Sequence, residues 1–269
     1  RLDPAANLAA DGRIVVLIDA SQIAALDLAT GKEKWKADFP LDAADRTAGG
    51  MQNFRNHLWV GAMIVTDGVV VHASPSKLAG LSADTGKLLW EQPKKFIQHL
   101  WYEWKDVFVI DGLVWTWSAE LDRKPLTGGT KKQGGTLAPR WANGYDLHTG
   151  ARKKQVEVGE IFTTHHHHRC YRDKATVRYI LASRRGTEFV SLEGGKHVVD
   201  NWVRGTCHVG MMPANGLQYA PPHPCQCYID EKLNGFNALT AARESARRPA
   251  AGPRLTTGPD RKSTRLNSS

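Results

Sequence analysis

The stretch GLSADTGKLLW at residues 80–90 decides the fold, because it repeats a phrase found earlier in the chain as ALDLATGKEKW at residues 25–35. In both copies an apolar strand leads into a Thr-Gly turn, and the next strand reaches a tryptophan, Trp90 or Trp35. A third, more diverged copy reads GYDLHTGARKKQ at residues 144–155. Such repetition indicates one supersecondary unit that is used several times.

A second phrase, Asp-Gly or Asn-Gly followed by an apolar run, accompanies the first. Its copies are spaced by 56, 44 and 104 residues, and the longest interval holds one degenerate copy at Arg172-Asp173-Lys174. These dipeptides favour two-residue hairpin turns, because both residues tolerate positive φ. Short strands repeating every 40–60 residues or so predict the blades of a propeller. The second phrase begins at Asp11-Gly12, Asp67-Gly68, Asp111-Gly112 and Asn215-Gly216.

Each predicted blade contains an inner strand, an Asp-Gly turn, two middle strands, a Thr-Gly turn and an outer strand. In Asp27–Gly31 and Ala83–Gly86 we expect Asp and Thr to bond to nearby backbone amides, with Gly in the left-handed conformation. We also expect Trp35 and Trp90 to fill the space between neighbouring blades. The predicted fold is all-β, a partial β-propeller of about four to five four-stranded antiparallel blades. Unrelated hairpins in a sandwich are the alternative.

On these phrases the chain resembles the pyrroloquinoline-quinone-like (PQQ-like) β-propeller repeat family over roughly residues 11–239. That family includes quinoprotein alcohol dehydrogenases and the propeller lipoprotein of outer-membrane assembly. One bacterial branch of the family has sequences similar to two segments of this chain, THHHHRCYRDKAT and NGLQYAPPHPCQCYIDEKLNGFNAL. The name of that branch describes the shape of its repeats and not demonstrated cofactor binding. The resemblance implies a fragment of a seven- or eight-bladed ring.

The resemblance also implies function. We expect an exported protein, periplasmic or at the cell surface, that acts as a binding or scaffold module for a protein or carbohydrate partner. The alternative is an oxidoreductase, quinoprotein-like or metal-dependent, with PQQ or a metal ion in the propeller channel. The sequence shows no adjacent cysteine pair like the one beside the quinone in quinoprotein dehydrogenases, and no catalytic constellation, so whether the chain is an enzyme stays open.

The C-terminal segments are expected to lie outside the propeller at residues 1–239. Residues 240–259 are rich in Ala, Arg and Pro and predict a linker or an excursion between blades. Residues 260–269, DRKSTRLNSS, match the translation of a common sequencing adapter and are interpreted as an artefact. Residues 240–269 carry seven basic and two acidic side chains, so the net charge of +9 falls to +4 without them. This small charge predicts no nucleic-acid binding, and the absence of a long apolar run predicts no membrane span.

Four consecutive histidines form the first candidate site. The blade order places them on an inner strand, before a turn predicted at Asp173-Lys174, and strand alternation would send them to opposite faces in pairs. They are either structural and surface side chains, or ligands for a metal or an anion. The residues are His165, His166, His167 and His168.

The hairpin around Asn215-Gly216 holds the second candidate site. If Asn215-Gly216 is a two-residue loop, the numbers of two residues that face each other across the hairpin add up to 431. His208 then lies opposite His223. The prolines of the second arm remove hydrogen-bond donors and favour an edge position. Three readings stay open: a disulfide from Cys207 to Cys225 or Cys227, a metal site, or free buried thiols. The candidate metal ligands here are Cys207, His208, His223, Cys225 and Cys227.

The aromatic segment at residues 99–117 is the third place that could carry chemistry. Its tryptophans either fill gaps between blades or stack on a planar ligand or sugar. A Gly/Lys-rich insertion at residues 123–140 lacks phosphate-loop spacing and predicts a surface loop. The four tryptophans are Trp101, Trp104, Trp115 and Trp117.

Overall fold

The structure, a computed structural model, confirms the predicted all-β fold. In the residues it describes, nineteen strands form five antiparallel sheets and no helix is present. That part of the chain therefore contains no helix long and apolar enough to cross a membrane. The described residues are 7–18, 22–38, 62–74, 76–94, 106–118, 139–159, 161–162, 171–183, 186–200, 203–206, 209–222, 233 and 235–241.

Each sheet is one blade, with its strands side by side in chain order. Blade 1 contains β1 (Asn7–Ala10), β2 (Ile14–Ile18), β3 (Gln22–Asp27) and β4 (Glu33–Asp38). Blade 2 contains β5 (Ala62–Thr66), β6 (Val69–Ala73), β7 (Lys77–Ser82) and β8 (Leu88–Pro93). Blade 3 contains β9 (Val107–Ile110), β10 (Leu113–Ser118), β11 (Trp141–Asp146) and β12 (Arg152–Glu157). Blade 4 contains β13 (Lys174–Ala175), β14 (Tyr179–Ala182), β15 (Thr187–Ser191) and β16 (Val198–Asp200). Blade 5 contains β17 (Met212–Ala214), β18 (Leu217–Ala220) and β19 (Asn237–Leu239).

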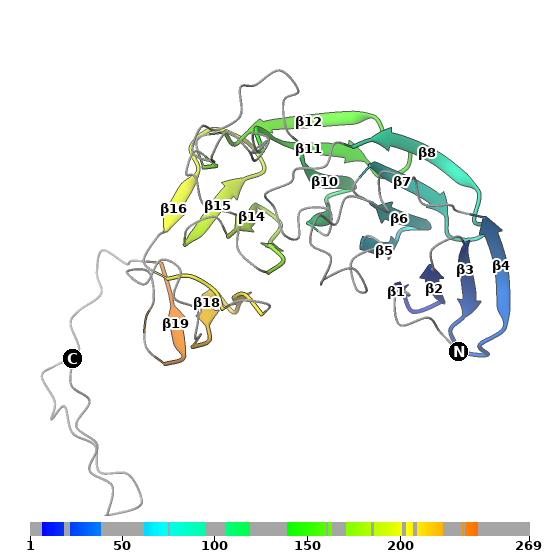
Figure 1. The fold of residues 1–269 in the computed structure, drawn as a ribbon, viewed down its shortest axis with the longest axis horizontal. Helices are drawn as coiled ribbons and strands as arrows, with labels where there is room; N and C mark the ends of the chain where they lie inside the picture. The colour runs from blue at the N-terminus through cyan, green and yellow to red at the C-terminus, as the bar shows by residue number, and fades with distance from the viewer. Residues whose placement is uncertain are drawn as a thin grey trace, which may run out of the picture.

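The blades follow one another around an open arc (Figure 1). The last strands of blades 1–4, β4, β8, β12 and β16, lie on the convex side of that arc. The first strands lie toward its concave side, which is the side of the predicted channel. This order of strands within a blade is the one predicted from the two repeated phrases.

The first turn of three blades has the predicted hairpin geometry. Asp67-Gly68, Asp111-Gly112 and Asn215-Gly216 each have two successive positive φ angles, 46° and 77°, 50° and 70°, and 53° and 73°. This is the pattern of a type I′ turn, which suits the right-handed twist of the flanking strands. The pairing of Met212 with Tyr219 confirms the predicted sum of 431 in blade 5.

Two first-turn predictions were wrong in position. In blade 1 the two-residue loop is Gly12-Arg13 rather than Asp11-Gly12, and only Gly12 has a positive φ, at 91°. The Asp11 carboxylate instead accepts the backbone N–H of Arg13 at 2.8 Å. In blade 4, Lys174 belongs to the inner strand β13, and the turn lies at residues 176–178 instead of Asp173-Lys174. There the Thr176 hydroxyl accepts the N–H of Tyr179 at 3.1 Å.

The Thr-Gly turns are held by an acceptor at their first residue. Asp27 Oδ1 accepts the backbone N–H of Thr30 at 2.9 Å and its hydroxyl at 2.7 Å. Asp146 makes the same two bonds to Thr149, both at 2.9 Å. In blade 2 the acceptor is Ser82, whose Oγ lies 3.3 Å from the N–H of Thr85, so the role expected of Asp84 belongs to Ser82.

Backbone bonds also join the two kinds of turn within a blade. The N–H of Leu28 donates to Arg13 O, and that of Ala83 to Gly68 O, both at 2.9 Å. Blades 3 and 4 repeat this bond from Leu147 and Leu192. The first and third turns of blades 1–4 therefore lie side by side at the same rim.

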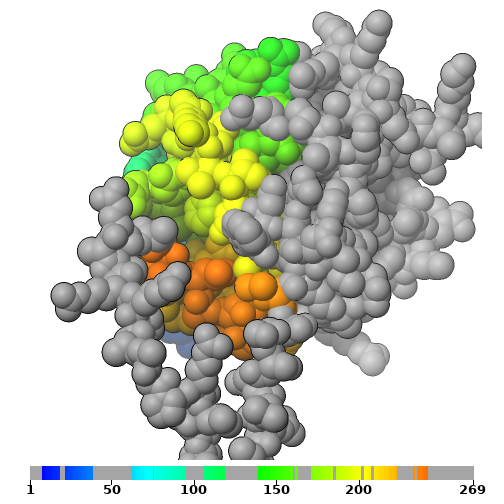
Figure 2. All heavy atoms as spheres, turned by 90° about the vertical axis from the view of Figure 1, so that its left-hand side faces the viewer, coloured from blue at the N-terminus to red at the C-terminus, as the bar shows by residue number. Residues whose placement is uncertain are grey.

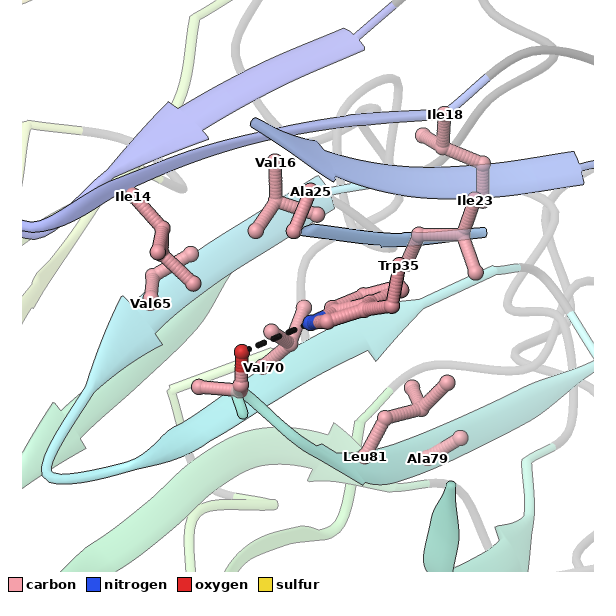
Figure 3. Close-up of a cluster of buried hydrophobic side chains, with 11 residues drawn as sticks. Ile14, Val16, Ile18, Ile23, Ala25, Trp35, Val65, Val70, Ala79 and Leu81 are labelled. Carbon is pink, nitrogen blue, oxygen red and sulfur yellow. Dashed lines mark hydrogen bonds between the residues drawn. The ribbon is translucent and has the colours of Figure 1, made fainter. Parts of the chain in front are cut away.

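Tryptophans of the outer strands join each of the first two blades to the next. The indole Nε1 of Trp35 donates to Ala83 O at 2.8 Å, and that of Trp90 donates to Leu147 O at 2.8 Å. Figure 3 shows Trp35 between the blade 1 side chains Val16 and Ala25 and the blade 2 side chain Leu81. Both indoles are buried, which confirms the predicted packing between neighbouring blades.

The Thr-Gly turns predict a dependence of stability on pH. Hydrogen bonds from the Thr30 hydroxyl and backbone lower the pKa of Asp27, and those from Thr149 lower the pKa of Asp146. Because folding lowers the pKa of these carboxyl groups, the carboxylates stabilise the fold at any pH above the ordinary Asp pKa of about 4. This stabilisation is lost as the pH falls through the pKa of the folded state. The double variant Asp27→Asn/Asp146→Asn should therefore melt below the parent at pH 7 and at the same temperature once the parent carboxyls are protonated.

The matched control is Asp84→Asn, which removes one carboxylate from a turn that Ser82 holds. At pH 7 this control should melt at the temperature of the parent, because Ser82 and not Asp84 makes the hydrogen bond of the turn. A difference in the double variant that does not change with pH would contradict the assignment.

Candidate functional site

Two buried carboxylates lie where the innermost strands of blades 3 and 4 begin. Asp106 immediately precedes β9 and Asp173 immediately precedes β13, and each is about 2% exposed. The backbone N–H of Asp173 donates to Asp106 Oδ1 at 2.9 Å. The Asp106 carboxylate of blade 3 thus holds the backbone at the start of β13, at the junction of these blades. We define Asp106, Asp173, Trp117 and Ser183 as the junction cluster.

Both oxygens of Asp173 accept hydrogen bonds from protein donors. Trp117 Nε1, from β10 of blade 3, donates to Oδ2 at 3.2 Å. Ser183 Oγ, which follows β14 of blade 4, donates to Oδ1 at 2.8 Å. The Trp117 ring also packs edge-on against Phe162, with centroids 5.3 Å apart. Asp173 therefore links the second strands of two blades, and its hydrogen bonds explain why a carboxylate is tolerated in the interior.

Lys174 provides a positive charge beside the cluster. It is half-buried on β13, and its Nζ donates to Arg172 O at 3.2 Å. Burial lowers the pKa of Lys174, and the nearby Arg172 lowers it further, while Asp106 and Asp173 oppose that shift. The inner junction is therefore charge-balanced and partly desolvated.

A histidine replaces tryptophan at the outer side of the same junction. Lys154 of blade 3 occupies the position of Trp35 and Trp90, opposite Gly144 in the ladder. His197, buried in blade 4, instead lies 2.7 Å by its Nε2 from Glu157 O. Its Nδ1 accepts the N–H of Ser191 at 3.2 Å, so Nε2 carries the proton and donates to Glu157.

The junction of blades 4 and 5 is also polar. Gln218 Nε2 donates to Thr187 Oγ1 at 2.7 Å, and Thr187 Oγ1 donates to Val203 O at 3.3 Å. Nearby, the N–H of Gly205 donates to the Tyr171 hydroxyl at 3.2 Å. Figure 2 shows blade 5 (orange) directly beside blade 4 (yellow). These bonds again serve to hold one blade against the next.

The sequence analysis missed the junction cluster, although a signal was present. Lys105-Asp106 and Arg172-Asp173 are the same basic-acidic pair, and each stands directly before an inner strand. We had interpreted the second pair as part of a decayed turn. The structural interpretation of the aromatic segment is confirmed for Trp115 and Trp117, which are 2% and 1% exposed.

The predicted metal ligands lie outside the described residues, so their role stays a prediction. The ladder of blade 5 is described from Met212 to Ala214, and Gly210 pairs back with Thr206 across an isolated bridge. The ligands concerned are His165, His166, His167, His168, Cys207, His208, His223, Cys225 and Cys227; Trp101 and Trp104 lie outside as well.

The described residues do not supply a donor set that fits a metal ion. Within them, no three His, Cys, Asp or Glu side chains gather around a common point. Both oxygens of Asp173 and one of Asp106 already accept hydrogen bonds from the protein.

Comparison with known proteins identifies the repeats. Residues 4–96 match the PQQ-like repeat model described as outer membrane protein assembly factor BamB, which confirms the predicted PQQ-like repeats. BamB from Moraxella catarrhalis is 12% identical with a TM-score of 0.48, and 79% of this chain covers 53% of that one. A quinohemoprotein alcohol dehydrogenase from Comamonas testosteroni is 17% identical with a TM-score of 0.45, and 80% of this chain covers 43% of it. The chain thus spans about half the length of these proteins. Comparison with curated proteins finds no match.

The junction cluster predicts a stability defect for Asp173→Asn. The Asn amide has one acceptor oxygen, whereas the carboxylate has two. It cannot bind the Ser183 hydroxyl and the Trp117 N–H as well as the carboxylate does. A buried donor left unsatisfied costs about 1–3 kcal/mol. Urea denaturation should show this loss in the free energy of unfolding. The matched control is Asp111→Asn, because Asn tolerates the positive φ of that turn and should unfold like the parent. Equal unfolding free energies for all three proteins would show that the cluster does not hold the junction.

Proposed function

We propose, from the PQQ-like repeats that residues 4–96 share with the BamB family, that the chain is a binding or scaffold propeller for a protein partner. The partner would contribute an extended segment that pairs with the outer edge of a blade. One observation carries this proposal: two of the outer strands expose apolar side chains along an open sheet edge.

The four outer strands differ in how their edges are protected. In β4 and β12 the exposed side chains are largely charged, among them Lys34, Lys36, Lys153 and Lys154. Lysines on an edge strand discourage pairing with another chain. The first and third blade edges are therefore blocked in the usual way.

The edges of blades 2 and 4 instead begin with exposed apolar side chains, and in β8 the charged Glu91 and then Pro93 follow only toward the end of the strand. Leu88 and Leu89 begin β8 with exposures of 55% and 48%, and Val198 and Val199 begin β16 with 53% and 52%. Open backbone groups next to exposed apolar side chains suit the addition of a strand, in which main-chain bonds give affinity and side-chain contacts give specificity. A protein segment supplies both kinds of contact.

A protein partner is favoured over a carbohydrate for this part of the molecule. Sugar recognition by stacking would need exposed aromatic faces, and the predicted candidates Trp115 and Trp117 are buried between blades, whereas the exposed Phe236 lies in blade 5, away from the aromatic segment. The description of the matching family names assembly of outer membrane proteins, which supports both a protein partner and a periplasmic or outer-membrane location. The oxidoreductase alternative depends on the histidines and cysteines outside the described residues, and it stays a prediction.

Site-specific photocrosslinking tests the proposal. A photoreactive amino acid replaces Val199 or Leu89 in the intact chain, and Lys153 on the blocked edge of blade 3 serves as the matched position. Irradiation in a cell-envelope extract of the source bacterium should give a discrete protein adduct when the photoreactive residue is at position 199 or at position 89. It should give no adduct when that residue is at position 153. A second substitution, Val198→Lys, should abolish the adduct at 199 without lowering the melting temperature. Adducts that are equally strong from all three positions, or absent from both apolar edges, would contradict the proposal.

A further inference from the structure

Two of the Asn-Gly dipeptides in this chain lie in opposite surroundings. Asn215-Gly216 forms the two-residue loop at the tip of the β17–β18 hairpin, and both residues are exposed. Asn143-Gly144 lies within β11, between β10 and β12, and both residues are buried. Because the two dipeptides are identical, a difference in their chemistry must come from the fold.

An Asn-Gly dipeptide can undergo deamidation. The backbone nitrogen of the glycine attacks Cγ of the asparagine, loses its proton and expels ammonia, so that a cyclic succinimide forms. Water then opens the ring at one of its two carbonyls and gives either aspartate or isoaspartate. Glycine favours this reaction because it has no Cβ to obstruct the approach of the two groups. Asparagine is for such reasons a thermolabile residue.

The surroundings of Asn215 leave both reacting groups accessible. Within the described part of the chain, the Asn215 side chain makes no hydrogen bond. The N–H of Gly216 belongs to the loop and not to the ladder, in which Ala214 pairs with Leu217. No described atom lies within 4 Å of the position that a Cβ on Gly216 would take. Neither reacting group is therefore held in place by these residues, and water reaches both.

The hairpin that carries this loop is short, which gives the loop the freedom that ring closure requires. β17 and β18 share three residue pairs, against five between β5 and β6 in blade 2. One of the three pairs includes Pro213, which has no N–H to donate. A hairpin with few backbone bonds opens locally at a small cost in free energy.

The fold restrains Asn143 at both ends of its amide. Its Nδ2 donates to the Tyr145 hydroxyl at 3.3 Å, and its Oδ1 accepts a hydrogen bond from Gln155 Nε2 at 3.1 Å. On Gly144, the position of a Cβ lies 3.2 Å from the Trp115 ring. Deamidation at this site therefore requires blade 3 to open.

We propose that Asn215 is a site of spontaneous deamidation in the folded protein and that Asn143 is protected from it. The aspartate product suits the turn, because Asp67 and Asp111 occupy the same place in blades 2 and 3, with φ angles of 46° and 50° against 53° for Asn215. The isoaspartate product does not suit it, since it lengthens the main chain of a tight two-residue loop. The proposal does not depend on what the blade edges bind.

Peptide mass spectrometry of the intact chain, aged in mildly alkaline buffer, tests the proposal. In the folded protein, conversion at Asn215 should exceed conversion at Asn143 by at least about tenfold, because only the buried site requires a blade to open. The rate at Asn215 should rise with pH, because the attacking nitrogen must lose its proton. In urea that unfolds the chain, the two sites should react at similar rates. Asn234-Gly235, whose asparagine lies outside the described residues, is followed as a separate peptide.

The matched control is Asn215→Asp, which should show no further mass gain at position 215 and should melt at the temperature of the parent. Electron-based fragmentation identifies the isoaspartate form, and its separated fraction should melt below the parent. Equal conversion of Asn143 and Asn215 in the folded protein would show that global unfolding controls the reaction, and would overturn the proposal. A folded chain that stays unconverted at Asn215 while the unfolded chain reacts would overturn it as well.

Discussion

The contact between an outer-strand tryptophan and the glycine turn of the next blade sets the arrangement of the first three blades. It combines an indole N–H bond of 2.8 Å with a ring placed where any side chain on Gly86 or Gly150 would stand. Glycine is required at these positions for two reasons: the backbone has a positive φ, and the indole ring approaches the Cα closely. A blade cannot bury its second face alone, so this contact turns a row of small sheets into one continuous core.

Where the repeat loses its tryptophan, polar contacts replace it. Lys154 stands at the tryptophan position of blade 3, and the junction with blade 4 depends instead on His197 outside and the Asp173 carboxylate inside. Titratable groups that would ordinarily suggest catalysis are thus engaged in joining blades. The exposed apolar side chains at the start of β8 and β16 are the surface on which the proposed binding or scaffold role depends.

The sequence predicted the features that depend on short stretches of chain. The I′ turns and the Thr-Gly turns are local, so their residues could be recognised directly, and the strand order followed from them. Long-range partners could not be recognised in this way, because Asp106 and Asp173 are 67 residues apart and meet only once blades 3 and 4 are packed. The shifts to Gly12-Arg13 and Ser82 escaped prediction because neighbouring residues could fill the same turn role. The predicted histidine and cysteine site concerns residues outside those described.

The most direct test of the account is a double-mutant cycle between Trp35 and Gly86. Trp35→Ala should cost roughly 3–5 kcal/mol of unfolding free energy, as expected for a core aromatic. In the parent, Gly86→Ala should cost about 1–3 kcal/mol for overpacking on top of its backbone strain of about 1 kcal/mol. Once Trp35 is alanine, only the backbone strain should remain, so the two substitutions are predicted to couple strongly. Additive losses, measured by urea denaturation of the four proteins, would contradict the claim that Gly86 is there to receive the ring.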